Sequence, residues 1–324
     1  MAVKKPPLDL SKPRYDRTTY IGRLKHFILL TNPLNLLASK QELDEAKLVV
    51  DNYKQTKIIP PDYDEEKIWK AKYLYDSAYH PDTGGKMSII GCMSAQVPMN
   101  TLLMAGMLTF YKTKPQIVFW QWLNQSFASL VNYTNRSGDA DISVRHIFLS
   151  YCAACGGAVC TVVYLNRIAR RLRNRLFAKL APFGGVCTAN CINIPTMRSH
   201  ELAMGTPVFT IPHGHRVGDS TIASTKGVCL VCCSRCLMAV PGLTFAPYIT
   251  NYAASHGLFC TRPMLSIPFQ ATMVALGMAI ATPTCCALWD QQDTLGVEEL
   301  ETELQEIIMK KYKGTKQVSY NKGL

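Results

Sequence analysis

Four cysteines lie within the segment CLVCCSRCLM and form two CxxC pairs, Cys229 with Cys232 and Cys233 with Cys236. Such pairs are typical of zinc sites and of thiol–disulfide exchange. On a helix, however, these four positions share one face, so the sulfurs form a line along more than one turn. A tetrahedral zinc shell needs ligands that converge, usually from a second element. We therefore interpret the cysteines as small packing residues, and we expect no metal, no other cofactor and no enzyme activity.

A second group of polar residues lies in the stretch 115–135, which contains no Asp, Glu, Lys or Arg. On a helical wheel they occupy an arc of about 80°. They are Gln121, Gln125, Ser129, Asn132 and, just beyond the stretch, Arg136. A helix surrounded by lipid does not tolerate such a stripe. The side chains either form hydrogen bonds between helices or line a polar translocation path, and a surface helix is the third alternative.

Further polar features interrupt the later apolar segments. Asn190 and Asn193 are three positions apart, and Arg235 is the only charged residue between positions 227 and 261. Pro241 falls where a membrane helix would continue, and it leaves a backbone carbonyl without its usual donor. Transporters hold polar substrates at such interrupted helices. We expect these residues to extend the polar path; the alternatives are helix–helix hydrogen bonds, an arginine that snorkels to the interface and a simple kink.

The elements that must position these residues follow from the distribution of charge. The chain has 324 residues, of which 48% are hydrophobic and only 18% charged, against roughly 25% charged in an average soluble domain. The deficit lies in residues 87–289, in long windows without Asp, Glu, Lys or Arg. A helix needs about 20 apolar residues to cross a bilayer. A soluble enzyme with a buried core is the alternative to a membrane protein.

The composition therefore predicts an all-α, multi-span membrane protein in which some of the transmembrane helices are broken. The transmembrane domain would be 87–289. Residues 1–86 would form a polar helical N-terminal region, with a capping box at Ser39 and Glu42. Residues 290–324 would form a polar helical C-terminal tail.

The formal charge of +12 is not spread evenly along the chain. Residues 167–179 hold six basic residues and no acid, between two apolar windows. The positive-inside rule predicts that this segment faces the negative side of the membrane and contacts anionic lipid. We expect no binding of nucleic acid, because the aromatic or groove-reading partners are missing. The N-terminus has no apolar stretch of a secretory signal and is a poor cleavable transit peptide.

Several motifs of the chain resemble those of the sideroflexins. They are HPDTG at 80–84, MSAQVPMN at 93–100, WQWLNQSF at 120–127, VNYTNRSGDA at 131–140, ANCINIP at 189–195 and the closing NKGL. The matches span nearly the whole chain in order. Three positions differ from the family pattern: Gly85 stands where Glu is frequent, Cys92 replaces an expected Arg, and Ala128 replaces the Asn after NQSF.

The resemblance implies a multi-pass protein of the mitochondrial inner membrane, with about five transmembrane helices and without a cleavable presequence. With five spans, the N-terminus would lie on the same side of the membrane as the basic segment 167–179. It implies amino-acid transport, above all serine import for one-carbon metabolism, with other small neutral amino acids as further substrates. The alternative is an inner-membrane scaffold or regulator of iron, haem or iron–sulfur homeostasis without transport activity of its own. We expect the motif His80, Pro81, Asp82, Thr83 and Gly84 to form a structured turn where the chain enters the membrane.

Overall fold

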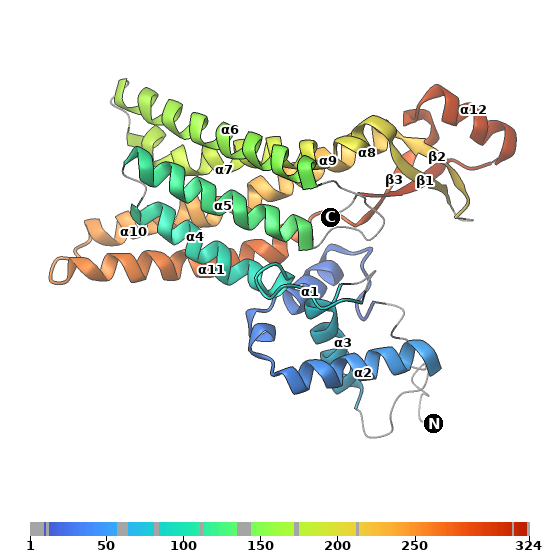
Figure 1. Ribbon diagram of the computed structural model, residues 1–324, viewed down its shortest axis with the longest axis horizontal. Coiled ribbons are helices and arrows are strands. Elements are labelled where there is room, and N and C mark those ends of the chain that lie inside the picture. The colour runs from blue at the N-terminus through green and yellow to red at the C-terminus, as the bar shows by residue number, and fades with distance from the viewer. Residues whose placement is uncertain are drawn as a thin grey trace.

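The computed structural model describes residues 10, 13–56, 64–80, 84–110, 113–134, 144–171, 175–211, 214–312 and 314–322. It has three parts: a helical N-terminal region, an elongated helical bundle, and a small sheet at one end of the bundle (Figure 1). The N-terminal region and the sheet lie near the same end.

The N-terminal region is a cluster of short helices. Its elements are α1 (Tyr20–Leu30), the 3₁₀ turn η1 (Pro33–Leu37), α2 (Lys40–Thr56) and α3 (Glu65–Ala78). The capping box is present: Ser39 N donates to Glu42 Oε2 at 2.8 Å, and Glu42 N donates to Ser39 Oγ at 3.2 Å. These two bonds satisfy donors that the first turn of α2 would otherwise leave free.

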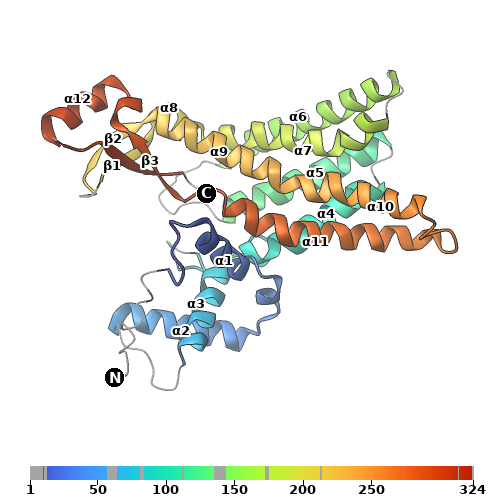
Figure 2. The same ribbon diagram turned by 180° about the vertical axis from the view of Figure 1, so that it is seen from behind.

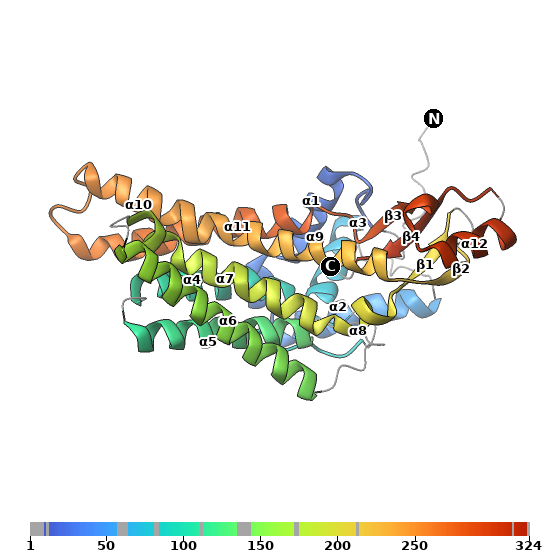
Figure 3. The same ribbon diagram turned by 90° about the horizontal axis from the view of Figure 1, so that it is seen from above.

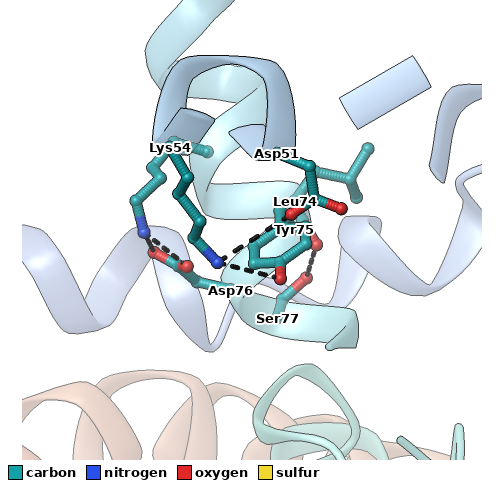
Figure 4. Close-up of polar contacts among 7 residues, drawn as sticks. Asp51, Lys54, Leu74, Tyr75, Asp76 and Ser77 are labelled. Carbon is teal, nitrogen blue, oxygen red and sulfur yellow. Dashed lines mark hydrogen bonds and ion pairs between the residues drawn. The ribbon is translucent and has the colours of Figure 1, made fainter. Parts of the chain in front are cut away.

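One hydrogen bond joins α2 to α3, and each helix also carries an ion pair of its own (Figure 4). Lys54 Nζ donates to the Tyr75 hydroxyl at 3.2 Å and lies 3.9 Å from Asp51 Oδ1. Lys72 and Asp76, one turn apart on α3, form an ion pair. The apolar faces of α2 and α3 meet in a core whose aromatic members are Tyr53, Trp69 and Tyr73.

His26 of α1 lies against this aromatic core, 5.7 Å from the Tyr73 ring centroid. Burial lowers the pKa of His26 to about 4, and the nearby charges of Arg17 and Lys72 act in the same direction. The imidazole is therefore neutral in the folded chain at physiological pH.

Long helices form the bundle and run along its axis (Figures 1 and 3). They are α4 (Gln96–Phe110), α5 (Lys114–Thr134), α6 (Val144–Arg171), α7 (Arg175–Met197), α9 (Thr221–Val240), α10 (Ala246–Ser255) and α11 (Ser266–Cys286). Shorter pieces connect them: η2 (Met93–Ala95), α8 (Ser199–Met204), η3 (Pro241–Phe245) and η4 (Pro263–Leu265). Small residues allow close approach; a Cβ on Gly106 of α4 would lie 2.0 Å from the Trp120 ring of α5.

Three helical stretches within the described residues are long and apolar enough to cross a membrane: Phe148–Arg171, Thr221–Ser255 and Pro263–Cys286. Helices α4, α5 and α7 pack in the same bundle beside them. The prediction of an all-α, multi-span membrane fold is confirmed. The number of spans stays a prediction.

The interruption expected at Pro241 has a different form from the one that the sequence suggested. The helix does not unwind there: α9 continues into α10 through the π-helical turn η3. A π turn widens the backbone spacing, which accommodates a proline that lacks its N–H. Pro241 packs closely against α11, since a Cβ on Gly277 would lie 3.1 Å from the Pro241 Cβ.

The C-terminal tail is not wholly helical, contrary to the prediction. It contains α12 (Thr302–Lys311), the turn η5 (Val297–Glu299) and two strands, β3 (Gln292–Gly296) and β4 (Gln317–Asn321). These strands join β1 (Thr206–Thr210) and β2 (Arg216–Ser220) in an antiparallel sheet of order β2-β1-β4-β3. Val208, Leu295, Val318 and Tyr320 of the sheet and Leu304 and Ile308 of α12 form its core. The tail therefore folds together with a segment from the middle of the chain.

The basic segment and the N-terminal region lie at opposite ends of the bundle. Helix α6 ends at Arg171 at the end far from α1, as the view from behind also shows (Figure 2). Three antiparallel helices, α4, α5 and α6, connect the two places. The side of the membrane on which each place lies stays a prediction, as does the number of spans.

Candidate functional site

A cavity lies inside the bundle between α4, α5, α7, α9 and α11. About 80 Å³ of it is open to the centres of water-sized molecules, which is room for roughly five to eight waters. Its polar lining is Gln96, Asn100, Asn124, Asn190, Asn193 and Arg235. The rest of its wall is apolar and consists mainly of Met104, Phe127, Val131, Val186, Met238 and Met278. A partly open polar chamber with room for several waters thus lies between helices of a membrane protein.

Helical periodicity explains why these residues converge. On α4, the lining residues are 96, 100 and 104, each one turn after the last. On α7, the lining positions 186, 190, 193 and 194 recur at intervals of three or four, and α9 contributes 235, 238 and 239. Each of these helices therefore directs one face toward the cavity. Together these faces present amides and one guanidinium among apolar side chains.

Two of the amides carry atoms without a hydrogen-bond partner in the part of the chain that the structure describes. They are Gln96 Nε2 and Asn193 Oδ1, on side chains that are 3% and 2% exposed. Asn100 Nδ2 donates to Gln96 Oε1 at 3.2 Å, which orients the Gln96 amide. A buried donor and a buried acceptor are therefore available to a polar solute.

The electrostatics of the lining favour a solute with a carboxylate. Arg235 supplies a fixed positive charge, and it makes no ion pair with any carboxylate among the described ranges. The other polar residues are uncharged amides that both donate and accept. A guanidinium binds a carboxylate through two parallel hydrogen bonds, which gives orientation as well as affinity.

The residues singled out from the sequence divide into two groups. Asn190, Asn193 and Arg235 line the cavity. Gln121 and Gln125 are fully buried but do not line it. A Cβ on Gly185 of α7 would lie 2.7 Å from Gln121 Nε2, so this glutamine is held between helices. Its position matches the alternative of contacts between helices.

The remaining candidates lie elsewhere. Ser129 is half-buried on α5 and Pro241 packs on α11; neither lines the cavity. Arg136 and the side chain of Asn132 lie outside the described residues.

Three lining residues escaped the sequence analysis: Gln96, Asn100 and Asn124. Gln96 and Asn100 are one turn apart in the otherwise apolar MSAQVPMN segment, and this spacing was an available signal. Asn124 lies off the arc of polar residues on α5, so its inward direction depends on how α5 packs.

Two backbone hydrogen bonds connect His80 to Gly84 and Gly85, at the end of the HPDTG motif. His80 N donates to Gly85 O at 2.9 Å, and Gly84 N donates to His80 O at 2.9 Å. Gly84 has a φ of +64°, a conformation that glycine adopts without strain. Pro81, Asp82 and Thr83 lie outside the described residues.

Two of the four cysteines of α9 lie next to α7. Cys232 Sγ is 4.0 Å from the carbonyl oxygen of Asn190, and Cys236 Sγ is 4.0 Å from that of Cys187. Cys229 and Cys233 are exposed on the bundle surface. No group of three or more His, Cys, Asp or Glu side chains is placed to hold a metal ion within the described residues.

The sheet supports the start of α9. Glu301 Oε1 accepts from Thr221 N at 2.7 Å and from Ile222 N at 3.0 Å, so its carboxylate caps the helix. Burial raises the pKa of Glu301, but these hydrogen bonds outweigh it and leave the pKa below its ordinary value. Lys322 of the closing NKGL is buried and pairs with Asp293 at 3.2 Å.

Fold and cavity define a multi-span helical membrane protein with a polar chamber inside its bundle. Comparison with known proteins specifies the family. The model of the family Sideroflexins matches residues 9–324. The chain is 45% identical over 319 residues to Sideroflexin-1 of Mus musculus, covering 98% of each chain. The chain belongs to the sideroflexin family, whose members are transporter-type proteins rather than enzymes.

Other relatives are similar over the same length. Sideroflexin-1-3 of Drosophila melanogaster is 43% identical over 319 residues, covering 98% of this chain and 99% of the relative. Sideroflexin-3 of Bos taurus is 45% identical over 320 residues, with the same coverage. No solved structure matches the chain.

Proposed function

We propose that this chain is a mitochondrial inner-membrane transporter that imports serine for one-carbon metabolism and also carries other small neutral amino acids. The observation that supports the proposal is the bundle cavity with Arg235 and five amide side chains. Membership of the sideroflexin family supports the transporter class and the membrane location.

The chemistry of the substrate matches the groups in the cavity. A zwitterion that leaves water for the membrane interior loses several kcal/mol of solvation unless the protein replaces it. In our proposal, Arg235 binds the carboxylate and Asn193 Oδ1 accepts from the ammonium group. Gln96 Nε2 donates to the hydroxyl oxygen. The cavity, in which about 80 Å³ is open to the centres of water-sized molecules, suits an amino acid with a small side chain.

The π turn η3 is the element that we propose moves during transport. A Cβ on Gly242 would lie 2.5 Å from Met104 Sδ and 3.5 Å from Met278 Sδ. Both methionines line the cavity. A π turn has weaker hydrogen-bond geometry than the helix around it and is frequent at functional sites. A change of bend at η3 would therefore move two walls of the chamber.

The membrane contacts of the chain belong to the same proposal. Anionic lipid would contact the basic segment 167–179 on the matrix side, held there by the membrane potential. The N-terminal region and the sheet would then face the opposite side, since they lie at the other end of the bundle.

Uptake of labelled serine into proteoliposomes that contain only the purified chain tests the proposal. Arg235→Gln removes the charge-assisted hydrogen bonds to the carboxylate, worth about 1.5–3 kcal/mol, so we expect uptake efficiency to fall roughly 10- to 150-fold. Lys226→Gln is the matched control: Lys226 lies on the same helix, outside the cavity, in a weak ion pair with Glu299 at 3.9 Å. It should transport normally.

Two outcomes would contradict the proposal. The first is no serine uptake by the unsubstituted chain, which would favour the scaffold alternative. The second is equal uptake by Arg235→Gln and Lys226→Gln, which would place the substrate path away from this cavity.

A further inference from the structure

Large apolar side chains are exposed on the N-terminal region, outside the bundle. Leu37 is 80% exposed, Leu34 66% and Ile89 67%, and Ile28 and Ile90 are exposed as well. We call these five residues the apolar patch. Patches of this kind on an otherwise polar region mark a surface that contacts a partner or a membrane.

The backbone of η1 presents its two leucines together. A 3₁₀ helix repeats every three residues, so Leu34 and Leu37 project from the same side of η1. Asn35, between them, points the other way: its Nδ2 donates to Leu29 O at 3.0 Å and lies 3.4 Å from Ser94 Oγ. The polar residue is thus tied inward while both leucines remain outside.

The same contacts join η1 to the segment that follows Ile89 and Ile90. Ser94 Oγ donates to Leu30 O at 3.1 Å, so the chain just after Ile89 and Ile90 is held against the end of α1. Elements η1 and η2 are packed side by side. The patch is therefore built from two stretches of the chain, 28–37 and 89–90, that tertiary contacts bring together.

The N-terminal region is anchored beside the bundle. Arg23 Nε donates to Ala287 O at 2.9 Å, and Arg17 Nη2 donates to Gln291 Oε1 at 2.8 Å. The chain between α1 and α2 lies on the side of the region that points along the bundle toward the far end of α11 (Figures 1 and 2). Helices α4 and α11 of the bundle carry exposed apolar side chains as well, among them Leu102 and Ile280.

We propose that the apolar patch inserts into the boundary between headgroups and acyl chains of the bilayer that surrounds the bundle. The N-terminal region then lies on the membrane surface as an interfacial element. The segment that carries Leu34 and Leu37 lies on the side of the N-terminal region that faces along the bundle axis (Figures 1 and 2), and this axis is the direction of the membrane normal in our proposal. A second copy in the same membrane would instead approach from the side of the bundle, so lipid is the occupant that the direction favours.

Fluorescence quenching by brominated phosphatidylcholine tests this contact. The variant Leu37→Trp is placed in nanodiscs that hold one chain each, which removes contacts with a second copy. The matched control is Met309→Trp, at a residue of similar exposure on α12, which lies at the outer side of the sheet, away from the bundle (Figure 1). The chain has 4 native tryptophans, so each variant is compared with the unsubstituted chain in the same lipid.

We expect lipid bromination to quench the emission that Leu37→Trp adds to the chain at least about twofold, and to leave the emission that Met309→Trp adds unchanged. Ile89→Trp should behave like Leu37→Trp and serves as the second variant if the first one folds poorly. Equal emission of both patch variants in brominated and ordinary lipid overturns the proposal. The outcome is independent of serine transport, because quenching is measured without substrate.

Discussion

The most informative single substitution in the cavity is Asn193→Leu. Asn193 is 2% exposed, and its Oδ1 accepts no hydrogen bond in the part of the chain that the structure describes. Leucine has a similar size but no polar atom. The substitution therefore removes the polar group while it preserves most of the packing of α7 against α9.

The sign of the stability change separates a binding residue from a packing residue. A buried polar atom left without a partner costs about 1–3 kcal/mol, and its removal relieves that cost. A hydrogen bond between membrane helices, by contrast, stabilises by about 0.6 kcal/mol on average. We expect Asn193→Leu to leave the free energy of unfolding unchanged or to raise it by up to about 2 kcal/mol. Serine uptake should fall at least roughly tenfold, because the ammonium group loses a charge-assisted acceptor.

Thermal unfolding in nanodiscs without substrate and uptake in proteoliposomes measure the two quantities. Ser234→Ala calibrates the first: Ser234 Oγ is buried on α9 and donates to Cys285 O at 2.8 Å, so its loss should destabilise the bundle by about 1 kcal/mol. If Asn193→Leu destabilised the chain as Ser234→Ala does and transported serine normally, Asn193 would be a helix contact and the binding argument would be refuted.

Two further predictions concern the π turn and the N-terminal region. Gly242→Ala places a Cβ 2.5 Å from Met104 Sδ, so we expect the flexible methionine to move into the cavity and serine uptake to fall; Gly156→Ala, with nothing within 4 Å, is the control. Normal uptake by Gly242→Ala would show that η3 tolerates the added group. For His26, the pKa falls from 6.5 to about 4 on folding. Between these two pH values the unfolded chain binds a proton that the folded chain does not. The free energy of unfolding is therefore undiminished above about pH 6.5 and declines by roughly 3 kcal/mol as the pH falls toward 4. His26→Phe should flatten this part of the pH dependence, as measured by hydrogen exchange of α1 and α3 in the full chain; an unchanged slope would contradict the assignment.

Sequence patterns of short range determined the fold class and several local features. Long windows without charge predicted the helical membrane bundle, because the bilayer requires internal hydrogen bonding and apolar surfaces over a fixed length. The capping box at Ser39 and the helix over 114–134 also follow from local spacing. Asn190, Asn193 and Arg235 were recognisable as candidates, since polar groups in apolar helices need partners.

Only the tertiary structure decided which of these polar groups meet. Gln121 and Asn124 are three residues apart on α5, yet one packs against α7 and the other lines the cavity. The direction of each side chain depends on how α5 as a whole is rotated about its axis. Contacts with residues on the neighbouring helices determine this rotation. The strands also depend on distant contacts, because β1 and β4 are more than 100 residues apart in the sequence. The two-stranded units β1–β2 and β3–β4 are marginally stable alone and form a stable sheet when β1 pairs with β4. Local spacing specifies which face a residue occupies, whereas packing between distant segments specifies what that face touches.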